Sequence, residues 1–298
     1  MLPFHCAPTD ITAVEHPIAN DGNADDGEVL ASLWEAWKIP FQMSQGWTSI
    51  DQWIASDRVV RDLLTPHRIT ALDLSGCRLT GLPPEMVRLT SLQVLYLDYN
   101  QLARLPPEIG RLSSLQGLYL DDNQLTSVPP EMGLLSSLQV LYLSHNQLTS
   151  LPPEIGQLSS LRVLGLNGNQ LTNLPPEIGR LSSLQVLGLS HNQLTSLPPE
   201  IGRLSSLQVL YLNDNQLTSL PPDFGLLSSL QRLYLDDNRL ASIPPEMSHL
   251  PSLRVLNLSG NYVLNATTGQ RFTKVGIGIV VVVVVVIAHA LTCLLTPP

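Results

Sequence analysis

A repeat of 23 residues is the feature of this sequence that most limits how it can fold. Eight complete units begin at residues 69, 92, 115, 138, 161, 184, 207 and 230, and a ninth begins at Leu253 and stops near Asn265. A single unit is too short to bury its own leucines, but stacked units form one continuous core, so this period predicts a solenoid. One asparagine marks each unit: Asn100, Asn123, Asn146, Asn169, Asn192, Asn215, Asn238 and Asn261. Cys77 occupies the same place one interval earlier.

Each unit combines a strand pattern with a turn and a return arc. Leu95 and Leu97 alternate as in a short strand that turns its leucines inward. Asn100 follows where the chain turns, and a buried amide there can satisfy backbone groups that the turn leaves unpaired. Pro106 and Pro107 remove two N–H donors and favour an extended outer arc. The Glu-Ile-Gly portion that follows predicts about one helical or 3-10 turn.

The pattern LPPEIGxLSSLQxLxLxxNQLTSLP resembles the leucine-rich-repeat family, and specifically its 23-residue intracellular type. The resemblance covers about residues 69–265. These repeats are similar to those of plant intracellular Ras-group proteins and of animal Ras-pathway and polarity scaffolds. It implies an α/β horseshoe solenoid with a parallel sheet on its concave face, and asparagines that act as a structural ladder. It also implies a signalling scaffold whose partner is a small GTPase or a phosphatase. The family is a binding architecture with many partners, so this last step is an analogy.

The N-terminal part precedes the repeats. Residues 1–27 carry prolines, glycines and an acidic cluster without apolar periodicity, which predicts disorder. Residues 28–68 place Leu30, Leu33 and Trp37 at helical spacing, and similar spacing continues through Val59 and Val60. Because a solenoid needs a cover over its first core layer, we expect 28–68 to be a small helical N-terminal cap. The alternative is an independent binding module.

The C-terminal part predicts a membrane anchor. After a linker at 266–274, residues 275–295 contain no formally charged side chain. As a helix they would be about 31 Å long, enough for the hydrocarbon core of a bilayer. Arg271 and Lys274 lie on the N-terminal side of this segment and no basic residue follows it, which places the repeats in the cytosol. The N-terminus lacks a basic region followed by an apolar run, so we expect no signal peptide and a single-pass, tail-anchored protein.

Two alternatives to this anchor remain open. An apolar tail after Asn265, Ala266 and Thr267 is also typical of a glycolipid-anchor signal, which requires secretion. A surface-anchored extracellular recognition receptor would then be the function. Alternatively, the valine run is a low-complexity extension of a cytoplasmic repeat protein.

The strand positions between and after the inward leucines predict the surface that binds a partner. They form rows about 4.8 Å apart on the concave face. A partner with a basic surface would suit the acidic edge of this face, and tyrosines are favoured interface anchors. The alternative is that recent internal duplication has merely repeated a tolerated tyrosine. The interruption of the row at Gly165 and Gly188 slightly favours a real binding contour. The predicted binding residues are Tyr96, Tyr119, Tyr142, Tyr211, Tyr234, Asp98, Asp121, Asp122, Asp236 and Asp237.

Composition argues against several functions. The formal net charge is −9, and Lys38 and Lys274 are the only lysines. This balance argues against nucleic-acid binding, and no lysine lies in a P-loop or kinase context. Three cysteines far apart predict neither a disulfide framework nor a zinc cluster.

No catalytic pattern is visible either. His145 and His191 lie two repeats apart, about 10 Å, and lack a third ligand, so we predict no metal site. The paired carboxylates Asp121/Asp122 and Asp236/Asp237 are expected to face solvent, without a pocket that would raise a pKa. We therefore predict a non-enzymatic binding protein that uses no cofactor.

Overall fold

A single sheet with one strand per repeat forms the concave side of the protein. The computed structural model describes residues 68–262, together with 26, 29–31, 33, 35 and 59–61. Within these residues the strands follow chain order across the sheet, β2 to β10 are parallel, and β1 pairs antiparallel with β2. The strands are β1 (Val59–Arg61), β2 (Ile69–Asp73), β3 (Val94–Tyr96), β4 (Gly117–Tyr119), β5 (Val140–Tyr142), β6 (Val163–Gly165), β7 (Val186–Gly188), β8 (Val209–Tyr211), β9 (Arg232–Tyr234) and β10 (Val255–Asn257).

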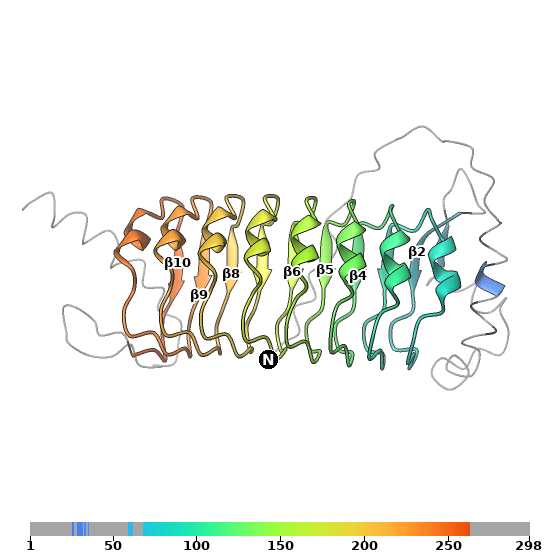
Figure 1. Ribbon diagram of the computed structural model, residues 1–298, viewed down its shortest axis with the longest axis horizontal. Helices are drawn as coiled ribbons and strands as arrows, with labels where there is room; N and C mark the ends of the chain where they lie inside the picture. The colour runs from blue at the N-terminus through green and yellow to red at the C-terminus, as the bar shows by residue number, and fades with distance from the viewer. Residues whose placement is uncertain are drawn as a thin grey trace, which may run out of the picture.

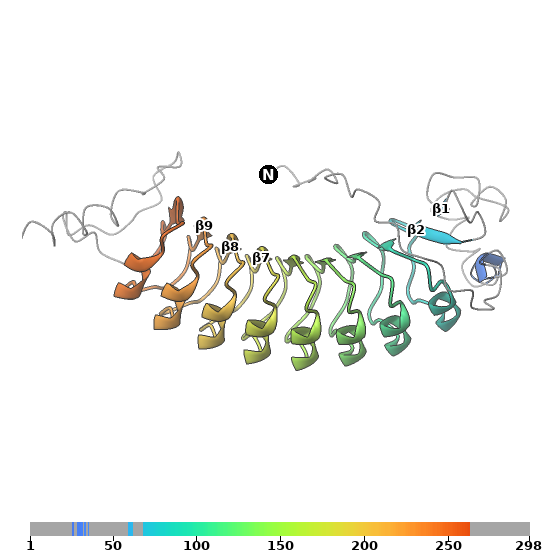
Figure 2. The same cartoon turned by 90° about the horizontal axis from the view of Figure 1, so that it is seen from above.

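Short 3-10 helices form the second layer. Each begins at the second proline of its repeat, where the missing N–H costs no hydrogen bond. They lie in front of the strands in Figure 1, and from above the two layers form an arc with the helices on the outer, convex side (Figure 2). The helices are η1 (Pro84–Arg88), η2 (Pro107–Arg111), η3 (Pro130–Leu134), η4 (Pro153–Gln157), η5 (Pro176–Arg180), η6 (Pro199–Arg203), η7 (Pro222–Leu226) and η8 (Pro245–His249).

The core lies between the two layers and repeats with the sequence. The exposed fraction of Leu95 and of Leu97 is 0%, while Tyr96 between them is only partly buried, so the predicted alternation is confirmed. Strand pairing keeps the leucines in register, with Leu95 opposite Leu118 and Leu118 opposite Leu141. Every side chain of one row therefore lies on the corresponding side chain of the next repeat.

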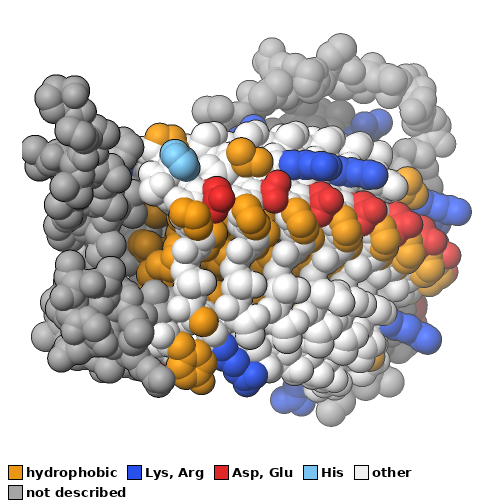
Figure 3. Space-filling view, turned by 60° about the vertical axis from the view of Figure 1, so that its left-hand side comes forward, with side chains coloured by type: hydrophobic (Ala, Val, Ile, Leu, Met, Phe, Trp, Pro, Cys, Tyr) orange, Lys and Arg blue, Asp and Glu red, His pale blue; other side chains and the backbone are white. Residues whose placement is uncertain are grey.

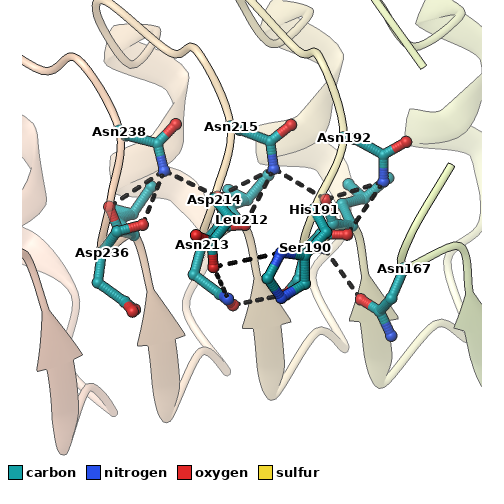
Figure 4. A network of polar contacts seen from close by, with 12 residues as sticks. Asn167, Ser190, His191, Asn192, Leu212, Asn213, Asp214, Asn215, Asp236 and Asn238 are labelled. Carbon is teal, nitrogen blue, oxygen red and sulfur yellow. Dashed lines mark hydrogen bonds and ion pairs between the residues drawn. The ribbon is translucent and has the colours of Figure 1, made fainter. Parts of the chain in front are cut away.

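The predicted asparagine ladder joins consecutive repeats. The amide Nδ2 of Asn169 donates to the carbonyl of Leu166 in its own repeat at 3.1 Å and to that of Leu143 in the preceding repeat at 2.9 Å. Its Oδ1 accepts the backbone N–H of Leu148 at 3.0 Å. The same bonds recur at the other asparagines, for example at Asn192. Figure 4 shows the bonds donated by the side-chain amides of Asn192, Asn215 and Asn238. The ladder satisfies buried backbone groups that no strand partner reaches.

Glycine allows the convex layer to pack closely. A Cβ atom added to Gly156 in η4 would lie 2.4 Å from the carbonyl oxygen of Glu177 in η5. The same clash would arise at the equivalent glycines from Gly110 to Gly225. Val87 takes this place in η1, and η1 packs less closely on η2 than the later helices pack on one another. Glycine is therefore required after Ile in PEIG, because the backbone of the next repeat leaves no room for a Cβ atom there.

The N-terminal cover of the core is partly helical and partly a strand. Leu30 and Leu33 are helical and fully buried, and the carboxylate of Asp26 accepts the N–H of Ile69 at 2.6 Å. Val59–Arg61, however, form β1, so the helical spacing predicted there was wrong. Adjacent β-branched residues favour a strand, and this strand pairs the edge that β2 would otherwise expose. The remainder of the predicted cap lies outside the described residues.

The predicted C-terminal helix also lies outside the described residues, as do the linker at 266–274 and most of the segment 1–27. Among the residues that the structure describes, no helix has the length and apolar character needed to cross a membrane.

Replacement of a ladder asparagine in the middle of the array tests its contribution to stability. Asn169→Ala leaves the buried N–H of Leu148 unpaired and removes bonds to the carbonyls of Leu143 and Leu166. We expect a loss of about 1–3 kcal/mol in the free energy of unfolding, the cost of a buried unpaired group. Urea unfolding followed by circular dichroism measures it. Gln170→Ala at the adjacent exposed position is the control and should change stability little; equal stability of the two variants would contradict the role of the ladder.

Candidate functional site

The tyrosines of the concave face form two separate stacks. Parallel register places Tyr96, Tyr119 and Tyr142 side by side on β3, β4 and β5, with ring centroids 4.6 Å and 5.5 Å apart. We call these three residues the first tyrosine stack. Tyr211 and Tyr234 on β8 and β9 form the second tyrosine stack, with centroids 5.0 Å apart and an interplanar angle of 6°. Stacked rings at this distance stabilise one another, so both stacks are preformed surfaces.

Side chains from the preceding repeat pack on the two glycines between the stacks. A Cβ atom at Gly165 would lie 2.6 Å from ring carbon Cδ1 of Tyr142, and one at Gly188 would lie 2.8 Å from Nδ2 of Asn167. The interruption expected from the sequence is therefore filled in part by Tyr142 and Asn167. Glycine at these positions makes room for the neighbouring side chain, which is a structural reason for the break in the tyrosine row.

Two aspartates beside the first tyrosine stack bond to the backbone of the next repeat. Oδ1 of Asp98 accepts the N–H of Asp121 at 2.8 Å, and Oδ1 of Asp121 accepts the N–H of Ser144 at 2.5 Å. Both side chains are half-buried. Burial raises the pKa of Asp98 to about 6 and that of Asp121 to about 7. Nearby Asp73 and Asp122 add to the rise in the pKa of Asp98, and Asp98 and Asp122 add to the rise in that of Asp121. The expectation that Asp121 faces solvent without a raised pKa was therefore wrong.

The phenols of Tyr96 and Tyr119 in the first tyrosine stack stay neutral over the same range. Burial, and after it the neighbouring Tyr96, Tyr142 and Asp98, raise the pKa of Tyr119 to about 12. Burial is also the main cause of the raised pKa of Tyr96, followed by Asp73 and Asp98. Near neutral pH this part of the face presents hydroxyl groups together with carboxylates that titrate.

The residue after this aspartate row has a left-handed backbone in every repeat. The φ angle of Asp122 is 54°, that of His145 is 54° and that of Asp237 is 53°. Glycine takes the place in three repeats, and Asp and His tolerate this conformation better than most residues. The left-handed turn is thus a structural reason for the presence of Asp122, Asp237 and the histidines at this position, and the sequence analysis missed it. The alternation of glycine with Asp and His at this position was the signal that could have revealed it.

The histidines lie apart and do not form a joint site. Gly168, in the intervening repeat, separates His145 from His191. His191 instead lies in a polar network with Asp214, with 3.5 Å between its Nδ1 and Oδ2 of the carboxylate. Nδ2 of Asn213 donates to the same Oδ2 at 2.9 Å (Figure 4). This network links β7 to β8 at the edge of the concave face.

Charge differs between the two stacks and between the two faces. Arg232 is exposed and is the only basic residue within the described strands β2–β10. It precedes Tyr234 by two positions, so both side chains point to the concave face. On the convex side, seven glutamates and Asp223 lie one per helix; Figure 3 shows a line of acidic side chains there.

Comparison with known families gives matches across the repeats. The model described as Leucine rich repeat matches residues 67–125 and 113–171, and the model described as Leucine-rich repeat region matches 177–274. Together they cover about two thirds of the chain. The comparison with curated proteins gives no match.

Several solved structures are similar. A plant peptide hormone receptor in complex with RGF2 is 39% identical, with a TM-score of 0.57 over 61% of this chain and 30% of the receptor. The leucine-rich-repeat ectodomain of the Arabidopsis thaliana membrane receptor kinase GASSHO1/SCHENGEN3, in complex with CASPARIAN STRIP INTEGRITY FACTOR 2, is 30% identical, with a TM-score of 0.64 over 77% and 32%. The Drosophila Toll–Spatzle complex is 28% identical, with a TM-score of 0.59 over 64% and 27%. This chain therefore spans about a third of the length of these proteins.

The raised pKa of Asp121 predicts a dependence of stability on pH. A carboxyl group whose pKa is higher in the folded state than its ordinary value of 3.8 stabilises the fold while protonated. This contribution is complete below about pH 4 and is lost as pH rises through about 7. Asp121→Asn keeps the oxygen that accepts the N–H of Ser144 but cannot ionise.

We expect Asp121→Asn to be more stable than the wild type at pH 8 by about 1–2 kcal/mol, since the side chain is only partly shielded from solvent. At pH 4 the two proteins should be similar. Urea midpoints between pH 4 and pH 8 measure this difference, and Glu246→Gln on the convex side is the control. A difference between variant and wild type that stays the same at both pH values would contradict the assignment.

Proposed function

This chain belongs to the leucine-rich-repeat family, and from that premise we propose that it is a non-enzymatic signalling scaffold that binds a protein partner on its concave face. The observation that carries the proposal is the first tyrosine stack. It places three aromatic side chains and two half-buried carboxylates, Asp98 and Asp121, on one sheet surface. Tyrosines are enriched at protein interfaces because they bury a large area and keep a polar group at the rim.

The comparisons support a protein or peptide as the ligand. The similar plant receptors and Toll were solved in complexes with RGF2, CASPARIAN STRIP INTEGRITY FACTOR 2 and Spatzle. For this chain we propose a cytosolic partner with a basic surface, and the resemblance to Ras-group repeat proteins favours a small GTPase or a phosphatase. The tyrosines of both stacks, with Asp98, Asp121, Asp122, Asp236 and Asp237, form the proposed binding surface.

We further propose that residues 275–295 hold the scaffold at a membrane, with the repeats in the cytosol. Their length without charge matches the thickness of a bilayer, and Arg271 and Lys274 precede them. Tethering would confine the concave face to partners near the same membrane and raise their effective concentration.

A second function is favoured by one specific observation. Two of the similar structures are a plant peptide hormone receptor and the ectodomain of a membrane receptor kinase. A surface-anchored extracellular recognition receptor is therefore the alternative, and the topology of the chain decides between the two.

Loss of aromatic contacts tests the concave face. The change is Tyr119→Ala with Tyr142→Ala, which removes two of the three rings of the first stack. We expect capture of the bound partner by photo-crosslinking to fall at least about tenfold, as for removal of interface anchors, with an unchanged circular dichroism spectrum. Leu134→Ala with Leu226→Ala is the matched control, since these leucines are 60% and 62% exposed at the ends of convex helices. Capture that falls equally in both double variants would count against the concave face.

Membrane fractionation tests the topology. We expect the full-length chain to stay in the pellet after carbonate extraction and a chain that ends at Lys274 to become soluble. Protease added outside intact vesicles should digest the repeats. Repeats protected inside the vesicles would contradict the scaffold and support the receptor, and a soluble full-length chain would contradict both anchors.

A further inference from the structure

The two tyrosine stacks are alike in geometry and different in charge. Strands β3, β4 and β5, which carry the first stack, contain no lysine or arginine, and Asp98, Asp121 and Asp122 follow them. The second stack is likewise followed by Asp214, Asp236 and Asp237, but it also has the exposed Arg232 on the same face of β9. A cationic partner is therefore attracted to the first stack more strongly than to the second.

The negative charge of Asp98 and Asp121 has no structural task that a neutral side chain could not perform. Asn167 takes the equivalent place two repeats after Asp121, and its Oδ1 accepts the N–H of Ser190 in the next repeat at 2.9 Å. The aspartates accept the equivalent N–H groups in the same way. A neutral amide avoids the cost of holding two carboxylates half-buried and close to each other. The charge at these two positions is thus left for a role outside the solenoid.

Each of these two carboxylates also keeps some capacity to accept a hydrogen bond. Oδ1 of each accepts the backbone N–H of the next repeat, and the side chain of Ser144 also bonds to the carboxylate of Asp121. An ionised carboxylate offers about four lone-pair sites, so these bonds leave room for a further donor. The two side chains belong to adjacent strands, about 4.8 Å apart in the sheet. Two carboxylates at this spacing suit a planar donor with several N–H groups, which can bond to both at once.

We propose that the concave surface of β3–β5 binds an arginine side chain of a partner protein, with the guanidinium bridging Asp98 and Asp121 and the apolar stem lying on the first tyrosine stack. This inference rests on the proposed function and names the chemistry of the partner. The guanidinium presents five donors in a rigid fork, whereas the lysine ammonium is a compact point charge that pairs with one carboxylate at a time. The stem carries methylene groups that pack on the tyrosine rings.

The interaction should strengthen as pH rises. Asp98 and Asp121 titrate with pKa values of about 6 and 7 in the free protein, and only their ionised forms bind a cation strongly. Asp73 and Asp122 act on Asp98, while Asp98 and Asp122 act on Asp121. Tyr96 and Tyr119 are the neighbouring titratable groups of the stack, and Asp98 raises the pKa of both. Because the tyrosine pKa values are raised above 10.0, the carboxylates account for any change between pH 5.5 and pH 7.5.

The test uses the full-length chain in a non-ionic detergent, with N-acetyl-tetra-arginine amide as the probe in isothermal titration calorimetry. The variant is Asp98→Asn with Asp121→Asn, which keeps both backbone bonds in the manner of Asn167. The control is Glu154→Gln with Glu177→Gln, which removes the same charge from two adjacent repeats on the convex side.

We expect the aspartate double variant to bind the probe at least about tenfold more weakly and the glutamate double variant to change affinity by less than about twofold. Tetra-lysine amide should bind the wild type at least about threefold more weakly than the arginine probe. Affinity of the wild type should rise from pH 5.5 to pH 7.5, and that of the aspartate double variant should stay level.

Equal losses in the two double variants, or equal affinity for the arginine and lysine probes, would overturn the inference, because the attraction would then be that of the net charge alone. Capture in the tyrosine experiment is measured separately. If capture depends on Tyr119 and Tyr142 while the probe result is negative, this inference fails and the proposed function stands. If neither partner capture nor probe binding depends on these concave-face residues, the inference and the proposed function both fail.

Discussion

The asparagine ladder is the interaction on which the rest of the solenoid depends. The strands β3 to β10 are three residues long, so strand pairing alone leaves many buried backbone groups without partners. Each asparagine side chain supplies hydrogen-bond partners for such groups from within the core. Asn192, for example, donates to the carbonyls of Leu166 and Leu189 and accepts the N–H of Leu171. Because these bonds cross from one repeat to the next, they fix the register in which every other row of side chains is stacked.

The properties of the concave face follow from that register. It stacks Tyr96, Tyr119 and Tyr142 into a continuous aromatic surface. It also aims Asp98 and Asp121 at the N–H of the following repeat. This second contact holds Asp98 and Asp121 half-buried, and their burial raises both pKa values although the hydrogen bond itself lowers them. On the convex side the same register sets glycine against the backbone of the next helix, which permits the close spacing of the outer layer. A surface for binding thus arises from the packing that holds the repeats together.

Much of this arrangement could be predicted from the sequence, because the repeat carries it. The inward direction of Leu95 and Leu97 and the bonding of Asn100 follow from spacing and side-chain chemistry alone, and the structure confirms both. The half-burial of Asp121 could not be predicted, since it depends on where a carboxylate points relative to the next repeat. Residues Val59–Arg61 form a strand and not the predicted helix because they pair with the open edge of β2, which exists only in the assembled sheet. The segment 275–295 lies outside the described residues, and its role as a membrane anchor stays a prediction.

Amide hydrogen exchange of the full-length chain, resolved by residue, is the most direct test that the ladder organises the array. The backbone N–H groups of Leu125, Leu148 and Leu171, which donate to asparagine side chains, should be protected to the same degree as the amides of the strands. Exchange of these three groups as fast as that of an exposed residue such as Thr149 would show that the asparagine bonds do not hold the repeats in register, and would contradict the account.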